Sequence, residues 1–443
     1  MTSIYDVAGI GIGPFNLSLA CMCEPLHELK TIFFDRKSEF SWHPGLMLPG
    51  TTLQTPFLCD LVTMADPTSR FSFLNFLKQS NRIYPFYIKE SFFPSRLEYN
   101  HYCRWAASQL STLRFSSEVI SIDYSDRDKC YLLKVKSVKE DVTQVYRTRR
   151  IVIGVGTTPC LPAGLRESEN SFHAAHYLSQ RSSVIASGSV IVVGSGQSAA
   201  EIFSDLLDQY SDHDNELTWV TRSPRFYPLE YTKLTLEMTS SEYIDHFYHL
   251  PDEKRSALGA THDNLYKGIN EELINSIYDR IYDLSVFGPV KIKLIGNSSV
   301  TGIDKSDYGH LQLLCHHNEL NRDYALVGKK IIFATGYERS VPKFIEGIKK
   351  RIRWTSEGYY APTRNYTVDI DDGGIFVQNG DLATHGISGP DLGMGCYRNS
   401  VILRSILGYA PYKVEKRTTF QDFRLTGHGI QERHDISARA LSA

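Results

Sequence analysis

The 443-residue sequence has no long apolar run and no excess of charge of either sign. No stretch approaches the roughly 18 consecutive apolar residues of a membrane-spanning helix, and the N-terminal residues show no basic or cleavable leader. The formal net charge of −2 provides no basic face for nucleic acid or anionic lipid. We therefore expect a cytoplasmic protein that binds neither nucleic acid nor membranes.

The eight cysteines and 15 histidines show none of the spacings that a zinc site or a disulfide framework requires. There is no Cys-x-x-Cys pair, so the redox dithiol of a flavin disulfide reductase is also missing. We expect no metal, and we expect most cysteines to be small buried apolar side chains.

What the chain does contain is two glycine-rich segments, each directly after an apolar run. In the first, Gly9, Gly11 and Gly13 are followed by Pro14. Gly9 suits a tight turn, Gly11 a close approach to a pyrophosphate, and Pro14 the first turn of a helix that points its N–H groups at that pyrophosphate. Asp35, 22 residues after Gly13, is predicted to bind the adenosine ribose. A glycine-rich hairpin turn is the alternative, which the acid disfavours.

The second segment follows the apolar run Val190–Val193. It carries Gly194 and Gly196, and Gln197 and Ser198 then open a predicted helix. Two such segments in one chain predict two dinucleotides, one kept and one exchanged, as in a flavin enzyme reduced by a nicotinamide.

Two arginines suggest which nicotinamide is used. The strand predicted over 217–221 is followed by Arg222 and Arg225. An acid at this place would suit the free ribose of NAD, whereas arginine accommodates a 2′-phosphate. We therefore predict NADPH, with ordinary surface cations as the alternative.

The length exceeds what one hydrophobic core usually supports, so several domains are expected. We predict an α/β fold with two Rossmann-like domains, one for FAD and one for NADPH. The FAD-binding domain is predicted over 1–162 and 336–443, and the NADPH-binding domain over 163–335. The late Ala334–Tyr337, which includes Thr335 and Gly336, marks the return to the FAD domain.

Other segments have weaker patterns. Residues 36–85 are rich in loops, helices are predicted over 97–110 and about 394–407, and strands are predicted within 114–160. The polar, tyrosine-rich segment 226–290 is predicted to be helical and without strands. It either caps the NADPH domain and lines a substrate pocket, or is a purely structural insertion.

Five motifs give a more specific indication: Gly9–Ser18, Phe40–Gly45, Leu53–Leu58, Asp66–Ser69 and Thr384–Ile387. Together they resemble the siderophore-pathway N-hydroxylating monooxygenases, that is, the lysine and ornithine N-monooxygenases and their diamine and histamine relatives. The resemblance covers nearly the whole chain. It implies an enzyme, usually a homotetramer, that uses FAD, NADPH and O₂ to hydroxylate a primary amine through a C4a-hydroperoxyflavin.

The resemblance also implies roles for individual residues. Trp42, His43 and Gln54 would lie beside the isoalloxazine and the nicotinamide, and Tyr266 and Arg222 would hold NADP⁺. The cofactor-binding set implied in this way also includes Thr335, Gly336 and Leu392.

The chain departs from the amino-acid hydroxylases at the substrate carboxylate. Those enzymes have a lysine five residues after the position of Gln54, and here that position is Cys59. Their asparagines for the amino-acid head group fall on Leu236 and Leu265, and their serine after Asp391-Leu392 is Gly393. An uncharged thiol cannot replace a buried cation opposite a carboxylate. The substrate implied is an amine without a carboxylate.

Putrescine or cadaverine is favoured, and histamine comes second. A diamine needs an acid for its distal ammonium, and Glu237 or Asp391 could serve, although either could be a solvent-facing carboxylate. Histamine would instead use the tyrosines of 227–282. The remaining alternatives are a lysine or ornithine hydroxylase with a rebuilt carboxylate site and a flavin-binding protein without enzymatic activity. A Baeyer–Villiger or sulfide-type monooxygenase is disfavoured, because its Phe-x-Gly-x-x-x-His signature is missing between the two glycine segments.

Overall fold

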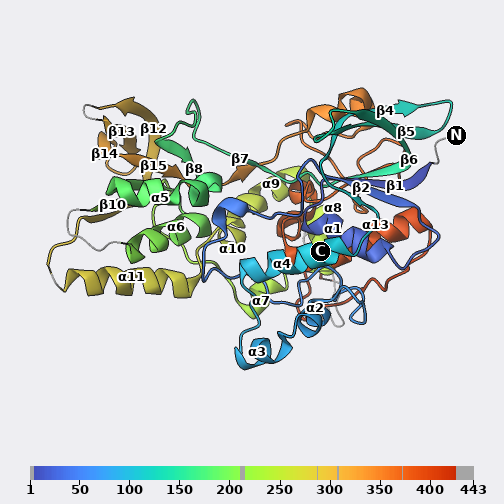
Figure 1. Ribbon diagram of the computed structural model, residues 1–443, viewed down its shortest axis with the longest axis horizontal. Helices are drawn as coiled ribbons and strands as arrows, with labels where there is room; N and C mark the ends of the chain where they lie inside the picture. The colour runs from blue at the N-terminus through green and yellow to red at the C-terminus, as the bar shows by residue number, and fades with distance from the viewer. Residues whose placement is uncertain (1–3, 210–214, 287, 307–308, 372, 426–443) are drawn as a thin grey trace, which may run out of the picture.

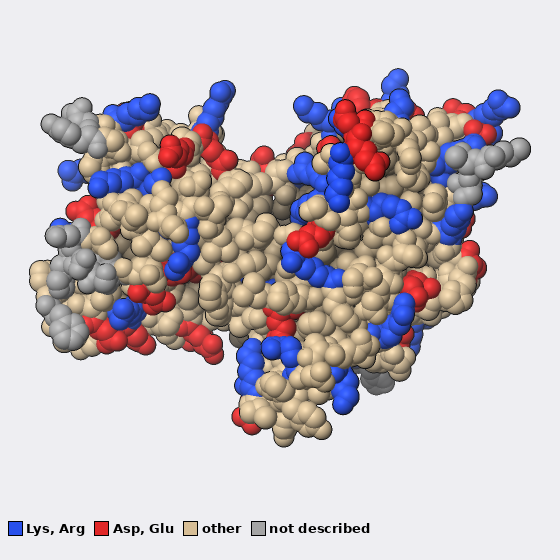
Figure 2. All heavy atoms as spheres, viewed as in Figure 1, with Lys and Arg blue, Asp and Glu red and all other residues tan. Residues whose placement is uncertain are grey.

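The structure is a computed structural model that describes residues 4–209, 215–286, 288–306, 309–371 and 373–425. It contains two α/β units side by side (Figure 1). The first unit is built around a sheet of residues 5–153 and 375–377, and the second around a sheet of residues 171–333. The space-filling view shows a notch between the units at the upper edge, with both signs of charge scattered over the visible face (Figure 2).

The first sheet has the strand order β3-β2-β1-β6-β5-β4, and β17 also pairs with β6. Its strands are β1 (Tyr5–Ile10), β2 (Thr31–Phe34), β3 (Leu113–Arg114), β4 (Ser117–Ser125), β5 (Cys130–Ser137), β6 (Thr143–Ile153) and β17 (Ile375–Val377). β1 runs parallel to β2 and β6, whereas β4, β5 and β6 form an antiparallel meander. The buried apolar runs of β1 and β2 are typical of parallel strands that are covered on both faces.

Alternate side chains of β1 lie on opposite faces of the sheet and pack in two different hydrophobic cores. Val7 packs with Leu17 under α1 (Pro14–Cys23), α4 (Arg96–Ser108) and α13 (Gly395–Leu407). Ala8 and Ile10 pack on the other face, beneath the 3₁₀ segment η4 (Lys343–Arg351), with Ile348. The helices predicted over 97–110 and 394–407 are thereby confirmed as α4 and α13.

The second sheet is entirely parallel, in the order β11-β10-β9-β15-β8. Val190 and Val192 of β9 face α6, whereas Ile191 and Val193 face a three-stranded antiparallel sheet. The main-sheet strands are β8 (Ser171–His173), β9 (Ser189–Val193), β10 (Glu216–Val220), β11 (Ile292–Ile295) and β15 (Lys330–Phe333). The covering elements are α5 (Tyr177–Ser187), α6 (Gln197–Asp208), α11 (Glu271–Ser285), β12 (Ser298–Lys305), β13 (Leu311–His317) and β14 (Arg322–Gly328). The predicted α/β class with two Rossmann-like units is confirmed.

The chain crosses between the units on a short two-stranded antiparallel ribbon. It consists of β7 (Thr158–Pro159) and β16 (Tyr337–Glu338). This ribbon lies beside the predicted boundaries at 162 and 336. Which cofactor each unit holds stays a prediction.

The segment 226–290 is helical, as expected, but it does not belong to the second unit alone. It contains α7 (Lys233–Leu236), α8 (Ser241–His249), α9 (Asp252–Thr261), α10 (Asp263–Tyr266) and α11. α11 packs on α6, whereas α8 and α9 pack on α12 (Leu382–His385) and on η5 (Gly386–Ser388) of the first unit. The segment therefore spans both units.

The loop-rich region 36–85 of the first unit also contacts the second unit. It contains η1 (Pro44–Leu46), α2 (Phe73–Gln79) and α3 (Ile83–Ile88). Leu46 and Leu48 are buried in the core of the second unit, and a Cβ on Gly45 would lie 1.8 Å from the carbonyl oxygen of Ala175. Among the described residues, no helix has the length and apolar character needed to cross a membrane.

Candidate functional site

The first glycine segment forms the turn between β1 and α1. Gly11 has a φ of 84°, and a Cβ there would lie 2.5 Å from the carbonyl oxygen of Gly154. A Cβ on Gly9 would lie 2.1 Å from the Phe33 ring. Both positions therefore require glycine, because a side chain would push the turn away from β6 and β2.

The N-terminus of α1 is left open. Gly13 is its N-cap, no side chain caps it, and a Cβ on Gly13 would meet nothing within 4 Å. Pro14 occupies the first turn, as predicted. Free N–H groups at the positive end of a helix, facing open space, fit a dinucleotide pyrophosphate.

Two side chains hold this turn in place. The Asp35 carboxylate accepts a hydrogen bond from the Ile12 N–H at 2.7 Å, which brings the predicted ribose ligand to the turn. The Asn16 side-chain amide donates to the Gly11 carbonyl at 2.8 Å and to the Val152 carbonyl at 3.3 Å. We did not single out Asn16 from the sequence, because its partners on β6 are distant along the chain.

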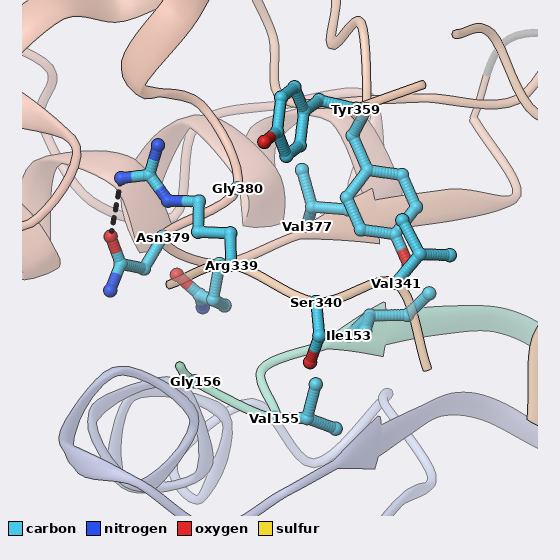
Figure 3. Close-up of a pocket in the computed structure, with 12 residues that line it drawn as sticks. Ile153, Val155, Gly156, Arg339, Ser340, Val341, Tyr359, Val377, Asn379 and Gly380 are labelled. Carbon is cyan, nitrogen blue, oxygen red and sulfur yellow. Dashed lines mark hydrogen bonds between the residues drawn. The ribbon is translucent and has the colours of Figure 1, made fainter. Parts of the chain in front are cut away.

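A small cleft opens at the carboxyl ends of β6 and β17, with room of about 30 Å³ (Figure 3). Ile153 and Val377 line it, and the Arg339 guanidinium donates to the Asn379 side chain at 3.4 Å. Ligands of open α/β sheets bind at this edge. The cleft therefore adjoins the open N-terminus of α1.

The second glycine segment repeats this construction. Gly194 has a φ of 142°, and a Cβ there would lie 2.2 Å from the Ala334 carbonyl oxygen. Gly196 is the N-cap of α6, again without a side-chain cap. Ser198 lies half-buried in the first turn of α6. The predicted second pyrophosphate site therefore has a helix end without a side-chain cap, but a Cβ on Gly196 would lie 3.3 Å from the Lys267 carbonyl oxygen, so it has less free space than the end of α1.

Gln197 has structural partners in this turn. Its amide donates to the Glu201 carboxylate at 2.9 Å, and its carbonyl oxygen accepts from the Asn270 N–H at 2.8 Å. It thus ties α6 to the N-terminus of α11. A direct contact between Gln197 and a cofactor stays a prediction.

The two arginines after β10 differ in their surroundings. Both side chains are exposed, and the Arg225 guanidinium lies over the Tyr227 ring at 4.8 Å. A contact between Arg222 and a 2′-phosphate stays a prediction.

A row of aromatic rings crosses from the first unit to the ribbon between the units. The ring centroids of Trp42 and His43 are 5.1 Å apart, those of His43 and Tyr337 are 5.4 Å apart, and those of Tyr337 and His173 are 5.2 Å apart. Trp42 and His43 were predicted for the reaction centre. His173 was not, because it lies 130 residues from His43 in the chain.

His43 is strained and uncharged. Its φ is 46°, in the left-handed region, where it precedes η1. Burial, followed by the charges of Arg96 and Lys37, lowers the pKa of His43 to about 4. The imidazole is therefore neutral at physiological pH.

Two further predicted cofactor residues, Thr335 and Gly336, lie beside the same ribbon. Thr335 donates its hydroxyl to the Cys160 carbonyl at 2.5 Å, and the Gly336 carbonyl accepts from the Cys160 N–H at 3.0 Å. Gln54 is half-buried after Leu53, whose N–H is bonded to the Pro94 carbonyl.

Tyr266 lines a larger cavity of about 460 Å³ between α9, α10 and the loop 380–387. Lys267 and Arg339 add positive charge to its wall, with Asp263 and Glu338 nearby. Burial lowers the pKa of the Arg339 guanidinium. The cavity is large enough to admit part of a ligand between the units.

Three of the predicted substrate residues meet at one point. A Cβ on Gly393 would lie 2.9 Å from the Asp391 carboxylate and 3.0 Å from the Cys59 sulfur. The Asp391 carboxylate caps η6 (Leu392–Met394), which contains Leu392, by accepting from the Gly393 N–H at 2.6 Å. The serine of the amino-acid hydroxylases would therefore crowd this place.

Electrostatics at this point favour a cationic ligand. Burial, followed by the charge of Asp391, raises the pKa of the Cys59 thiol to about 12. Burial also raises the pKa of Asp391, against the hydrogen bonds from Gly393 and Met394 and the charge of Arg398. An ammonium group would further offset the cost of ionising this carboxylate. We use the name amine pocket for the cluster of Cys59, Asp391 and Gly393, which lines neither of the two cavities described above.

Tyr231 is the tyrosine of the helical segment on which the charges of the amine pocket act. Its ring centroid is 6.4 Å from that of Phe93. Burial, then the charges of Cys59 and Asp391, raise the pKa of Tyr231 to about 12. The tyrosines of 227–282 were predicted as a group, and the fold brings this one to the pocket.

The other predicted substrate residues lie on or next to the short helices of 226–290. Leu236 ends α7 and Leu265 lies in α10, both half-buried. The Glu237 carboxylate accepts hydrogen bonds from the N–H groups of Phe420 and Gln421, at 2.8 and 3.0 Å. Both acids thus accept backbone hydrogen bonds, and Asp391 is the one that lies beside Gly393 and Cys59.

Comparison with known proteins agrees with this geometry. The family model described as L-lysine 6-monooxygenase/L-ornithine 5-monooxygenase matches residues 3–339. A putrescine N-hydroxylase of Shewanella oneidensis is 48% identical, over 100% of this chain and 88% of the relative.

Solved structures give the same result. DfoA bound to FAD, the cadaverine monooxygenase of the desferrioxamine pathway of Erwinia amylovora, is 46% identical, with a TM-score of 0.93 over 95% of this chain and 98% of that one. The Kutzneria sp. 744 ornithine N-hydroxylase with reduced FAD, NADP⁺ and L-ornithine is 29% identical, with a TM-score of 0.86 over 92% and 99%. The protein therefore belongs to the L-lysine 6-monooxygenase/L-ornithine 5-monooxygenase family.

Proposed function

We propose that this protein is an FAD- and NADPH-dependent N-hydroxylase of a small diamine, putrescine or cadaverine, in siderophore biosynthesis. The observation that carries the proposal is the amine pocket, where a thiol and a carboxylate stand in place of the cation that a substrate carboxylate needs. The similarity to a putrescine N-hydroxylase and a cadaverine monooxygenase supports the same substrate class.

The N-termini of α1 and α6, neither of which has a side-chain cap, support the cofactor assignment. FAD binds in the first unit, over 1–162 and 336–443, with its pyrophosphate at the N-terminus of α1. NADPH binds in the second unit, over 163–335, with its pyrophosphate at the N-terminus of α6 and its 2′-phosphate at Arg222. When bound, these cofactors supply the hydride and the activated oxygen, and the protein supplies binding and orientation.

The residues of the chain have three tasks. Asp391 holds the distal ammonium, so that the other nitrogen points away from the carboxylate. That reacting amine, whose reference pKa is about 10.4, must lose its proton, and the low polarity around Trp42, Tyr337 and neutral His43 favours the uncharged form. The same rings keep water from the reaction centre.

Histamine is the second candidate, because Tyr231 beside Phe93 offers an aromatic wall for an imidazole. L-Lysine and L-ornithine are disfavoured, since the buried Cys59 thiol provides no cation for their carboxylates.

We also propose that the enzyme is a cytoplasmic homotetramer. The exposed side chains of α3 support a contact between copies: Tyr84, Tyr87 and Ile88 are 72%, 77% and 71% exposed. Sedimentation analysis tests this, because Tyr87→Glu is expected to shift the protein to a smaller species.

The first experiment measures hydroxylamine formed by the FAD-loaded protein with NADPH and O₂. The substrates are putrescine, cadaverine, histamine, lysine and ornithine. Product from a diamine, and none from the two amino acids, is the expected result. Product mainly from lysine or ornithine would overturn the substrate assignment.

A variant tests the role of the acid. Asp391→Asn keeps the shape of the side chain and removes its charge, so the KM for the diamine is expected to rise by about tenfold or more. An unchanged KM would show that the distal ammonium binds elsewhere.

A further inference from the structure

Two carboxylates of the helical segment 226–290, those of Glu237 and Glu242, accept hydrogen bonds from the C-terminal segment 415–425. Glu242, in the first turn of α8, accepts from both the N–H and the hydroxyl of Thr418 and of Thr419. The Thr418 hydroxyl is at 2.8 Å and the Thr419 N–H at 3.0 Å. Thr419 is buried beneath this contact.

The second carboxylate is Glu237, which follows α7. It accepts from the N–H of Phe420 and from both the N–H and the side-chain amide of Gln421. The same amide donates to the Leu234 carbonyl at 2.6 Å. Four consecutive residues of the C-terminal segment thus bond to two acids that lie five residues apart.

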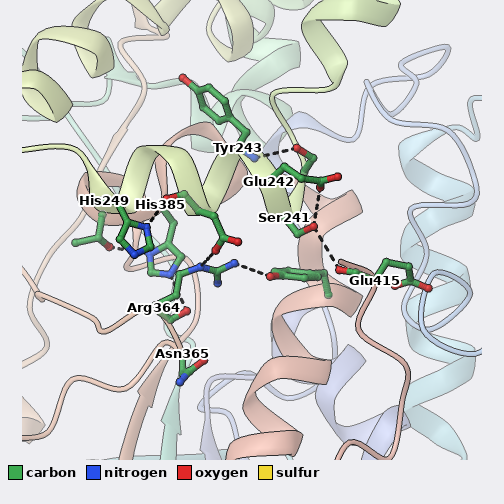
Figure 4. A network of polar contacts seen from close by, with 12 residues as sticks. Ser241, Glu242, Tyr243, His249, Arg364, Asn365, His385 and Glu415 are labelled. Carbon is green, nitrogen blue, oxygen red and sulfur yellow. Dashed lines mark hydrogen bonds and ion pairs between the residues drawn. The ribbon is translucent and has the colours of Figure 1, made fainter. Parts of the chain in front are cut away.

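The contact has an apolar part as well. The Phe423 ring packs edge-on against Tyr243 at 5.1 Å, and Tyr243 is buried in α8. Figure 4 shows the Ser241 hydroxyl directed at the Glu415 carbonyl, 3.5 Å away. Residues 415–423 therefore lie along α7 and α8.

Both acids are charged when these bonds form. Burial opposes ionisation of Glu242, but the hydrogen bonds from Thr418 and Ser241 prevail and lower the pKa of Glu242 to about 2. The backbone N–H of Phe420 likewise lowers the pKa of Glu237. Hydrogen bonds to an ionised acceptor are stronger than neutral ones.

α8 is also fixed to the first unit. The Arg364 guanidinium pairs with Asp245 at 2.5 Å and donates to the Tyr397 hydroxyl at 2.7 Å (Figure 4). The Ser388 hydroxyl donates to the Met238 carbonyl at 3.4 Å. Ser388 lies three residues before Asp391, so the link between α7 and α8 contacts the stretch of chain that carries the pocket acid.

Tyr231 links these helices to the amine pocket. It lies just before α7, and the charges of Cys59 and Asp391 act on its hydroxyl. Leu236, at the end of α7, is followed directly by Glu237. A shift of α7 would therefore move Tyr231 relative to Cys59 and Asp391.

We propose that residues 415–425 form a clamp that holds α7 and α8 against the amine pocket, with Glu237 and Glu242 as its positioning residues. The inference rests on the proposed diamine hydroxylation. With the clamp loosened, Tyr231 moves relative to the amine pocket, the amine binds less tightly, and water reaches the reaction centre.

The test compares Glu242→Ala and Glu242→Gln with the parent in the full-length, FAD-loaded protein. The matched control is Glu272→Ala, which removes an exposed acid from the first turn of α11. The measurements are the KM and kcat for putrescine and cadaverine, the hydroxylamine formed per NADPH consumed, and the rate of flavin reduction by NADPH.

We expect Glu242→Ala to raise the KM by about tenfold and to lower the hydroxylamine yield per NADPH, with flavin reduction unchanged. Glu242→Gln should restore part of both values, and Glu272→Ala should match the parent. Parent-like KM and yield in Glu242→Ala would overturn the clamp. So would a parallel loss of FAD content, flavin reduction and hydroxylation, because that pattern indicates a purely structural role.

Limited trypsin cleavage after Arg417 and Arg424 gives a readout that is independent of activity. Faster cleavage in Glu242→Ala than in Glu272→Ala supports the clamp, and equal rates refute it. If the parent hydroxylates no diamine at all, the proposed function fails, and the cleavage rates still decide whether the clamp exists.

Discussion

The Arg96 guanidinium and the Glu201 carboxylate form a two-point ion pair that joins the two units. Both nitrogen–oxygen distances are 2.7 Å, and the side chains are only 13% and 4% exposed. Arg96 also donates to the Leu46 carbonyl at 3.4 Å, next to the loop that carries His43. Glu201 in turn accepts from Gln197 at the open end of α6. The pair thus connects the predicted reaction centre to the predicted NADPH helix.

Arg96→Met should destabilise the protein, because it leaves the buried Glu201 carboxylate without its cation. We expect a loss of about 3–5 kcal/mol in the free energy of unfolding, measured by denaturant titration. The KM for NADPH should also rise, since the end of α6 loses its support.

The matched control is Arg181→Met, which removes a two-point ion pair with Asp205 inside the second unit. That pair is more exposed and crosses no interface, so the KM for NADPH should stay unchanged. The double variant Arg96→Met, Glu201→Met should recover much of the stability. Equal effects of Arg96→Met and Arg181→Met on the KM would contradict a role in joining the units.

Arg222→Ala should reduce the preference for NADPH over NADH. The exposed guanidinium after β10 is the predicted partner of the 2′-phosphate, and a charge-assisted bond of this kind accounts for about tenfold or more in affinity. Steady-state kinetics with both nucleotides measure the ratio. Arg225→Ala is the control, because Arg225 lies over Tyr227. The assignment is wrong if Arg225→Ala changes the preference and Arg222→Ala does not.

Cys59→Lys should weaken the use of diamines. A Cβ on Gly393 would lie 2.9 Å from the Asp391 carboxylate and 3.0 Å from the Cys59 sulfur, so residues 59 and 391 are neighbours, and we expect the new ammonium to pair with Asp391 in place of the substrate ammonium. We expect the KM for the diamine to rise by about tenfold or more. Cys59→Ser, which adds no charge, should retain most of the activity. Diamine kinetics unaffected by Cys59→Lys would place the pocket elsewhere.

His43 should make the folded protein sensitive to mild acid. Its pKa is about 4 in the folded protein, against about 6.5 in an unfolded chain. The unfolded state therefore binds more protons between these pH values, and stability falls as the pH drops through that window. The slope is about 1.4 kcal/mol per pH unit.

His43→Asn should reduce this slope, since asparagine tolerates the positive φ and does not titrate. Urea titrations of both proteins from pH 7 to about pH 4 give the slopes. His385 has the same pKa of about 4 and leaves a residual slope in the variant. Identical slopes in the two proteins would exclude His43 as a contributor.

The glycine turns show what could be predicted from the sequence. Gly11 and Gly194 adopt backbone conformations that other residues rarely adopt, and each follows a buried strand, so the turn, the helix after it and the open helix end follow from neighbouring residues. The same local patterns predicted α4 and α13.

The contacts between the units could not be predicted in this way. Arg96 and Glu201 are 105 residues apart, and the sequence contains many other residues of opposite charge with which each could pair. The sequence pattern indicates that residues 44–48 are a loop of the first unit. In the structure, Leu46 and Leu48 are buried in the core of the second unit. Glu237, predicted as a possible substrate ligand, instead bonds to a C-terminal segment in which we saw no pattern.

The sequence by itself therefore determined the two α/β units, their glycine turns and the missing cation at Cys59, because these depend on backbone conformation, apolar periodicity and residue type. Only the tertiary structure decided which groups meet: Asp391 with Cys59, Tyr337 with His43, and the C-terminal segment with α7 and α8. Such contacts depend on how distant segments pack, and a linear pattern does not record that packing.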